Sequence, residues 1–147
     1  MELDQIFIEK MIRQIIREDM GKGNGDSKQV DPSGVISVDP KAYTLEKFPF
    51  PIESDRVFLK DIFSQEESPR MGCGIMELED TSFEWTLQYD EIDYIMDGTL
   101  EVIMDGRTVS SKAGSLLLIP KGTKVTFSAK GKVRFLYVVS PANWTEQ

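Results

Sequence analysis

The chain has 147 residues, a net charge of −8, no histidine and one cysteine, Cys73. This length fits a single domain with a short appendage. The lack of histidine excludes an imidazole base and any histidine metal ligand, and a lone cysteine excludes an intramolecular disulfide and a multi-cysteine zinc site. We therefore expect no transition metal. A bound metal ion would be held by oxygen atoms, which favours Mg²⁺, Ca²⁺ or Mn²⁺.

The charge is distributed unevenly along the chain. Residues 1–106 carry 24 acids and 10 bases, whereas residues 107–147 carry one acid and seven bases. The negative total argues against nucleic-acid binding and against binding to an anionic membrane. No apolar run has transmembrane length and no signal peptide is recognised, so we expect a cytoplasmic protein. The asymmetry indicates either strands that pair acids with bases or an acidic pocket beside a basic rim.

Residues 1–20 are predicted to form an amphipathic helix, because apolar residues recur four apart along one face. These residues are Phe7, Ile8, Met11, Ile12, Ile15 and Ile16. Residues 21–34 are rich in glycine and polar residues and are predicted to be a flexible linker. The apolar face of such a helix would dock on its own domain, on a second copy, or in a groove of another protein.

Residues 35–147 are predicted to be all-β. The strand-like runs are short and regularly spaced: Val35–Val38, Val57–Phe63, Met71–Glu79, Phe83–Leu87, Glu91–Met96, Thr99–Met104, Arg107–Ser110, Ser115–Ile119, Val125–Ser128 and Val133–Val139. Turn signals such as Asp105-Gly106 and Lys130-Gly131 separate several of these runs. Many short strands with turns between them indicate a β-sandwich or a β-barrel.

Two spaced motifs point to a particular barrel. Glu91 is followed after six residues by Gly98, and Gly114 is followed after five residues by Pro120 and then by Gly122. In this order the motifs resemble the two conserved motifs of the cupins. The resemblance implies one small double-sheet jelly-roll barrel of the RmlC-like type. Its glycines and proline determine turns, so they indicate the fold and not the chemistry.

The metal ligands that this resemblance implies are nearly all missing. The segment in place of the histidine pair reads Glu84-Trp85-Thr86, and the third histidine position is Val125, so only Glu91 remains. Because side chains alternate along a strand, we expect Glu84 and Thr86 to face into the barrel together with Glu91 and Asp93.

Carboxylates that share one cavity need a cation or a proton between them. The predicted set is therefore either a Mg²⁺ site or a general acid with a raised pKa. The alternative is that Glu84 lies at the solvent-exposed mouth and Glu91 makes a structural hydrogen bond.

Longer stretches resemble one histidine-poor branch, the ethanolamine-utilisation EutQ family. They are 83–94, 97–109, 114–123 and 133–144. The resemblance implies a role in ethanolamine breakdown in or beside a bacterial microcompartment. It also implies acetate kinase activity, with ATP as a substrate, and suggests that residues 1–20 dock the protein on the compartment shell.

The candidate site follows from these expectations. Glu84, Glu91 and Asp93 are the proposed catalytic residues and Mg²⁺ ligands. The proposed substrate-binding residues are Thr86, Tyr89, Tyr94 and Arg107. No phosphate-binding glycine loop supports a kinase independently. Two other functions therefore stay open: a non-catalytic scaffold and a barrel that binds a small metabolite. A homodimer is expected by analogy of fold, through the edges Val35–Val38 and 40–55.

Overall fold

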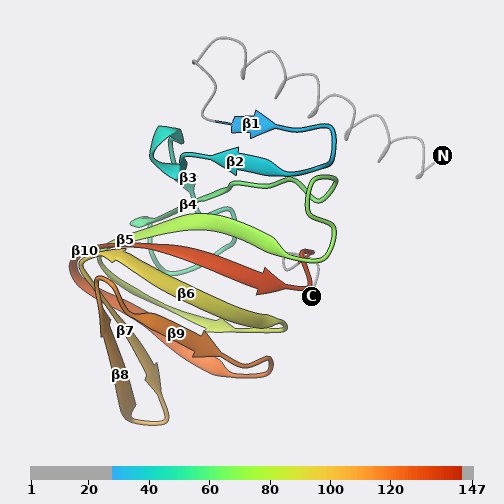
Figure 1. The fold of residues 1–147 in the computed structure, drawn as a ribbon. Helices are drawn as coiled ribbons and strands as arrows, with labels where there is room; N and C mark the ends of the chain where they lie inside the picture. The colour runs from blue at the N-terminus through green and yellow to red at the C-terminus, as the bar shows by residue number, and fades with distance from the viewer. Residues whose placement is uncertain (1–27, 144–147) are drawn as a thin grey trace. The chain divides into compact units, whose positions relative to one another are not determined.

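The structure is a computed structural model that describes residues 28–143. The predicted helix at 1–20 and residues 21–27 of the predicted linker lie outside the described residues. The chain divides after Tyr43 into two units. In the described part the chain is almost entirely β and has no α-helix (Figure 1). No helix among these residues is long and apolar enough to cross a membrane.

The described part of the first unit is a small hairpin, which corrects the linker prediction. β1 (Lys28–Val30) pairs antiparallel with β2 (Ile36–Val38). The turn between them reads Asp-Pro-Ser-Gly, which places proline and glycine where a tight turn prefers them. The Asp31 carboxylate accepts a hydrogen bond from the Ser33 amide at 2.8 Å. The loop-like composition of 28–34 therefore encodes an ordered turn and a strand.

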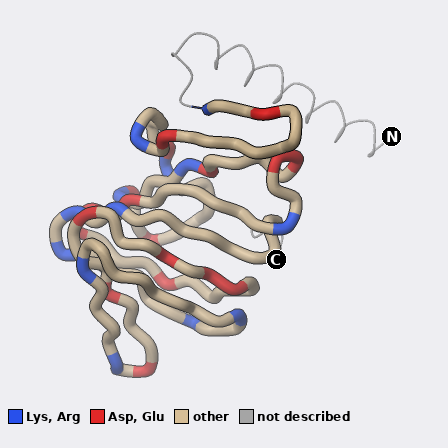
Figure 2. The backbone as a smooth tube through the Cα atoms, in the orientation of Figure 1, with Lys and Arg blue, Asp and Glu red and all other residues tan. Residues whose placement is uncertain are grey.

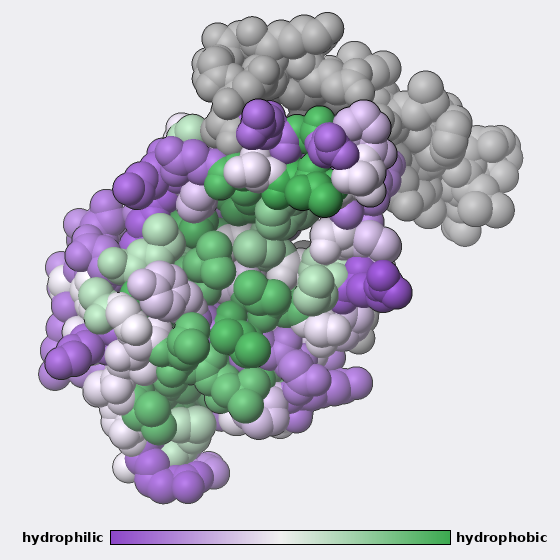
Figure 3. All heavy atoms as spheres, viewed as in Figure 1, coloured by the Kyte–Doolittle hydropathy of each residue, from purple (hydrophilic) through white to green (hydrophobic). Residues whose placement is uncertain are grey.

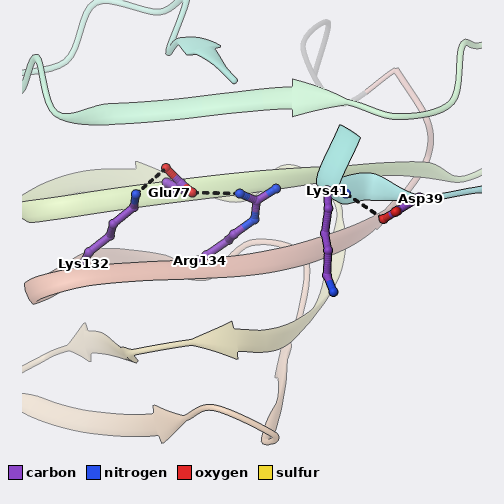
Figure 4. Close-up of polar contacts among 5 residues, drawn as sticks. All are labelled: Asp39, Lys41, Glu77, Lys132 and Arg134. Carbon is purple, nitrogen blue, oxygen red and sulfur yellow. Dashed lines mark hydrogen bonds and ion pairs between the residues drawn. The ribbon is translucent and has the colours of Figure 1, made fainter. Parts of the chain in front are cut away.

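A single turn of 3-10 helix, η1 (Pro40–Ala42), follows the hairpin. The side chain of Asp39 caps this turn by accepting a hydrogen bond from the Lys41 amide at 3.0 Å (Figure 4). The amide at the first position of a helical turn has no hydrogen-bond acceptor within the turn. Proline, which has no amide hydrogen, therefore fits at this position.

The second unit is a jelly roll built around two long strands. Its strands are β3 (Glu46–Lys47), β4 (Val57–Asp61), β5 (Gly72–Thr86), β6 (Asp90–Asp97), β7 (Thr99–Met104), β8 (Arg107–Lys112), β9 (Leu116–Ile119) and β10 (Lys124–Ser140). The strand order is β3-β4-β5-β10-β6-β9, with β7 joining β10 to β8. β10 pairs with β5 over most of its length, while its first part pairs with β7 and its second part with β6 (Figure 1). The predicted all-β fold is thereby confirmed.

Two predicted strand breaks prove to be bends within continuous strands. The interruptions at 80–82 and 129–132 lie inside β5 and β10, where the pairing register shifts between Ala129 and Lys132. Asp80 and Gly131 have positive φ angles of 44° and 78°, and the Asp80 carboxylate accepts from the Gly131 amide at 2.7 Å. The Lys130-Gly131 signal therefore marks a β-bulge and not a hairpin turn.

Cross-strand ion pairs explain part of the charge asymmetry. Glu77 of β5 bonds Arg134 of β10 at 3.1 Å and lies 3.5 Å from Lys132 of the same strand (Figure 4). An acidic strand from the first part of the chain thus pairs with a basic strand from the last part. This arrangement supports the interpretation that opposite charges match across the sheet.

Candidate functional site

Two acidic residues of β6 lie inside the barrel. Acids occupy four of the eight positions of this strand (Figure 2). Alternation directs Glu91 and Asp93 inward, where they are 7% and 0% exposed. Asp93 lies opposite Tyr137 of β10 and Leu117 of β9. Glu91 Oε2 and both carboxyl oxygens of Asp93 are buried and have no hydrogen-bond partner in the structure.

Burial of these two acids favours their protonated forms. Desolvation raises the pKa of Glu91 from its ordinary value of 4.5 to about 8. Desolvation raises the pKa of Asp93 as well, and the nearby Glu91 charge adds to the effect. Among residues 28–143 no lysine or arginine forms an ion pair with either carboxyl, so burial favours a protonated pair near neutral pH. A neutral carboxyl group donates a hydrogen bond, which a carboxylate does not.

A small, mainly aromatic cavity adjoins Glu91. Its volume, taken as the space open to the centre of a water molecule, is about 20 Å³. The residues that line it are Phe48, Met76, Phe83, Trp85, Tyr89, Glu91, Phe127, Phe135, Tyr137 and Val139. A cavity of this size holds about one water molecule. A larger ligand therefore enters only if some of the lining side chains move.

Three rings, from Phe48, Phe50 and Trp85, form an aromatic cap beside this cavity. Their centroids are 5.4 to 5.5 Å apart. The Trp85 indole also donates a hydrogen bond to the Tyr89 hydroxyl at 2.8 Å. Two of the three rings line the cavity, so movement of the cap would change its volume. Phe50 and Trp85 are only partly buried, so the cap lies on the side of the cavity that is nearer to solvent.

The predicted direction of Glu84 and Thr86 is wrong. Phe83 is the buried side chain of this part of β5, while Glu84 and Thr86 are exposed. The strand runs continuously into the turn before β6, so its alternation places aromatic residues on the inner face. The sequence left open that Glu84 is exposed to solvent, and the structure supports this alternative.

The exposed acid and threonine instead line a shallow, open hollow on the barrel surface. The hollow has a volume of about 380 Å³ and is lined by Glu84, Trp85, Thr86, Gln88 and Lys124. Trp85 lines both this hollow and the interior cavity. The two spaces therefore share one wall residue.

The predicted substrate-binding residues are separated in the structure. Tyr89 is buried and lines the cavity beside Glu91. Tyr94 is exposed on the outer face of β6, and Arg107 is exposed at the β7–β8 turn, 3.8 Å from Asp105. Among the predicted site residues, the interior therefore gathers only Tyr89, Glu91 and Asp93.

The predicted three-carboxylate Mg²⁺ site does not form, because Glu84 lies on the opposite face of the barrel wall from Glu91. Residues 28–143 contain no group of three or more acidic or cysteine side chains that could hold a metal ion. Mg²⁺ also keeps several of its waters, for which a cavity of about 20 Å³ has no room. The interior acids therefore do not fit Mg²⁺ as a resident ion.

Sequence reasoning missed two residues of the interior, Trp85 and Tyr137. The Tyr137 hydroxyl donates a hydrogen bond to Asp61, and burial raises the pKa of Tyr137. The sequence does contain a signal for the inward face of β5. Phe83, Trp85 and Leu87 are large apolar residues at alternate positions, which predicts that they lie on the same, buried face.

The jelly-roll topology, its two long paired strands and its interior site define the class of the protein. A cupin domain from Schizosaccharomyces pombe Cnp3 aligns over 67% of this chain and 73% of its own, with a TM-score of 0.52 and 16% identity. This likeness concerns the fold alone, and it assigns the chain to the cupin-like barrels.

The particular family follows from the sequence. The profile described as ethanolamine utilisation protein EutQ matches residues 3–146, and the chain belongs to this family. It is 45% identical to a Clostridioides difficile protein named acetate kinase EutQ, over 99% of this chain and 96% of the relative. It is 36% identical to the Escherichia coli protein of the same name and spans 59% of that longer chain. The solved Clostridium difficile EutQ structure aligns over 82% of this chain and 90% of its own, with a TM-score of 0.73 and 46% identity.

Proposed function

We propose that this protein interconverts acetate and ATP with acetyl phosphate and ADP, as part of ethanolamine utilisation. The observation that carries the proposal is the 45% identity, over nearly the whole length of both chains, to a relative named acetate kinase EutQ. The alignment covers 99% of this chain and 96% of that relative. The geometry then suggests which residues take part.

The interior suits a small carboxylate once Glu91 is protonated. A pKa of about 8 keeps the Glu91 carboxyl largely neutral at pH 7, so it donates a hydrogen bond to acetate and does not repel it. The aromatic walls of the cavity offer contacts to the acetate methyl group. Acetate is larger than one water molecule, so the aromatic cap of Phe48, Phe50 and Trp85 moves when acetate enters.

The outer hollow suits the phosphates of a nucleotide. Lys124 supplies a positive charge there, and Glu84 supplies a carboxylate for the Mg²⁺ that arrives with ATP as substrate. Trp85 borders both spaces, so an acetate oxygen that points past this ring would face the terminal phosphate. In this arrangement Glu84 and Thr86 keep a predicted role, at a different place from the one expected.

The reaction needs positioning more than acid or base catalysis. An acetate oxygen forms a bond to the terminal phosphorus of ATP, and the bond from that phosphorus to the bridging oxygen breaks, with its electron pair leaving on ADP. No proton is gained or lost by the reactants in this step. Glu91 therefore acts by holding acetate in line with the terminal phosphate.

The decisive experiment measures acetyl phosphate formation by the purified full-length protein with acetate, ATP and Mg²⁺. Glu91→Leu removes the hydrogen-bond donor and is expected to lower kcat/KM for acetate at least tenfold, on the order of the value of one good hydrogen bond to a charged group. In the wild type, ionisation of Glu91 above pH 8 is expected to raise the KM for acetate, because the carboxylate no longer donates a hydrogen bond. Glu91→Gln keeps a donor that does not ionise. This variant is therefore expected to retain activity and to show no such rise in KM.

The matched control is Asp105→Asn, an exposed acid at the β7–β8 turn whose positive φ angle of 49° asparagine tolerates. It should leave kcat/KM and the pH profile unchanged. Binding of acetate without turnover would favour the metabolite-binding alternative. Full activity of Glu91→Leu would remove the interior site.

The predicted docking of residues 1–20 on a microcompartment shell stays a prediction, because these residues lie outside the described part of the chain. The same holds for the expected cytoplasmic or compartment location. The apolar pattern of the segment is their support from the sequence.

A further inference from the structure

Strand β6 reverses the usual distribution of polar and apolar side chains. Its inward positions carry the buried acids Glu91 and Asp93. Its outward positions carry Ile92 and Tyr94, which are 48% and 44% exposed, and Figure 3 shows hydrophobic residues gathered over the region of β6, β9 and β10. A strand that serves packing alone places its apolar residues toward the core. The inner acids therefore need an explanation other than the stability of the barrel.

The oxygens of these two acids offer unused hydrogen-bonding capacity. Glu91 Oε2 and both carboxyl oxygens of Asp93 have no partner among residues 28–143, and both side chains are more than nine-tenths buried. A proton on each acid removes the charge but adds an O–H group that needs an acceptor of its own. Because buried polar groups are nearly always hydrogen-bonded, these oxygens are the atoms of the interior to which a ligand would bind.

Aromatic rings surround the Glu91 side of this acid pair. Seven aromatic side chains line the cavity together with Glu91: Phe48, Phe83, Trp85, Tyr89, Phe127, Phe135 and Tyr137. No lysine or arginine of the described chain lines it. The faces of aromatic rings carry partial negative charge and attract organic cations, ammonium ions above all. A buried acid within a group of rings is therefore suited to a ligand with a positive nitrogen and a short carbon chain.

We propose that the interior of the barrel binds a small primary ammonium ion, with its nitrogen at the carboxylate of Glu91 and its carbon atoms against the aromatic rings. A primary ammonium group has three N–H donors to offer the oxygens of Glu91 and Asp93, whereas a quaternary ammonium ion has none. The cavity of about 20 Å³ limits the ligand to a few non-hydrogen atoms, even when the aromatic cap moves.

This inference rests on the proposed function in one respect, because the cation and acetate would occupy the same space. Glu91 holds acetate as a neutral carboxyl group and holds the cation as a carboxylate. Binding of the cation therefore releases the Glu91 proton to solvent, and no other bond forms or breaks. The cation is thus expected to act as an inhibitor that competes with acetate.

The groups around Glu91 determine how the binding of the cation depends on pH. Tyr89, Asp93 and Tyr137 are the titratable groups that face Glu91, and Asp61 and Cys73 interact with Tyr137 in turn. Burial raises the pKa of both tyrosines, so they stay neutral. The negative charge that meets the cation therefore comes from the two acids of β6, and binding should tighten as the pH rises from 6 to 8.

The test is a calorimetric titration of the full-length protein with ethylammonium chloride, without ATP or acetate. This probe has three non-hydrogen atoms, so a Kd on the order of 1 mM at pH 8 is expected. Glu91→Gln is expected to weaken binding at least tenfold, because an amide does not ionise. Asp105→Asn, which removes an exposed acid, is the matched control and should bind like the wild type. Cooperative thermal unfolding establishes that the variants are folded.

Two further probes separate charge from size. Ethanol has the same number of non-hydrogen atoms without the charge, and it should not bind. Tetramethylammonium keeps the charge without N–H donors, and it should bind at least tenfold more weakly than ethylammonium. Tighter binding of tetramethylammonium would overturn the assignment to a primary ammonium ion.

The remaining outcomes locate the cation. Absence of binding up to about 50 mM, or binding that survives Glu91→Gln, would overturn the proposal. A loss in Glu84→Gln in place of Glu91→Gln would also overturn it, because Glu84 lines the outer hollow. In the kinase assay, ethylammonium is expected to raise the KM for acetate and to leave kcat unchanged. A protein that binds the cation but forms no acetyl phosphate would refute the proposed function alone, because the titration contains no substrate.

Discussion

Replacing Glu91 by glutamine should change how the stability of the barrel depends on pH. In the unfolded chain this carboxyl titrates near its ordinary pKa of 4.5, whereas in the folded protein burial raises its pKa to about 8. Between these values the folded state binds more protons than the unfolded state, so raising the pH favours unfolding. The stabilising contribution is complete below pH 4.5 and is lost as the pH rises through 8.

The size of the effect follows from the width of this window. One proton that differs between the two states changes the free energy of unfolding by at most about 1.4 kcal/mol per pH unit. From pH 5 to pH 8 the wild type should therefore lose roughly 3 to 4 kcal/mol through Glu91, out of a total of about 5 to 15 kcal/mol for an ordinary domain. Glutamine has nearly the same shape and no charge, so Glu91→Gln should show a flatter profile and higher stability at pH 8, and the slope that remains should come from Asp93.

Urea unfolding followed by circular dichroism at pH 5, 6, 7 and 8 measures this difference. Glu84→Gln is the control, because Glu84 is an exposed glutamate of the same barrel, and its profile should match that of the wild type. Asp93→Asn should also flatten the profile, because its pKa is raised by burial and by Glu91. If Glu91→Gln keeps the wild-type slope, or if the wild type becomes more stable toward pH 8, the reasoning about a buried protonated acid is wrong.

Two further substitutions test how the barrel is packed. A side chain at Gly74 would overlap the Tyr137 ring, so Gly74→Ala should lower the free energy of unfolding by on the order of 2 kcal/mol, measured by urea unfolding. Replacing Glu77 by alanine leaves Arg134 and Lys132 without their shared carboxylate, and it should cost about 1 to 2 kcal/mol in the same assay, because Glu77 and Arg134 are largely buried.

A comparison variant tests the reasoning behind each of these two predictions. For the ion pair, Glu46→Ala removes an acid whose bond to Lys60 is exposed, so it should cost less than 0.5 kcal/mol by the usual value of surface pairs. Equal losses for Glu46→Ala and Glu77→Ala would contradict the role given to burial. For Gly74, a loss that is rescued by Tyr137→Phe would point to the hydroxyl group, and a loss that persists would point to the ring and the adjacent backbone.

The motif residues predicted the barrel, because they determine backbone turns that hold wherever the fold occurs. Gly98, Gly114 and Gly122 all adopt the positive φ angles that glycine favours, and Asp105-Gly106 forms the hairpin turn expected of that pair. The bends at Asp80 and Gly131 were not predictable, because a glycine with a preceding polar residue is compatible with a bulge and with a turn. Only the pairing of β5 with β10 decides between them.

The site was predicted less well than the fold, because the prediction depended on which face of β5 each alternating side chain occupies. Glu91 and Asp93 were placed correctly because they belong to the motif strand itself. Glu84 and Thr86 were placed by counting back across the turn before β6, and a turn breaks the alternation that the count relies on. A shift of one residue moves every side chain to the other face, so Trp85 occupies the interior that was assigned to its neighbours.

The length of β10 also has a consequence for how the protein is made. This strand pairs with β5, β6 and β7, yet it is synthesised after all of them. Until it emerges from the ribosome, β5 lacks the neighbour that it shares with β6 and β7, and its partner residues lie 38 to 67 positions further along the chain. Pairings of such long range are slow to form and leave strand edges open in the meantime. The nascent barrel therefore stays incomplete until β10 has been synthesised and pairs with all three strands.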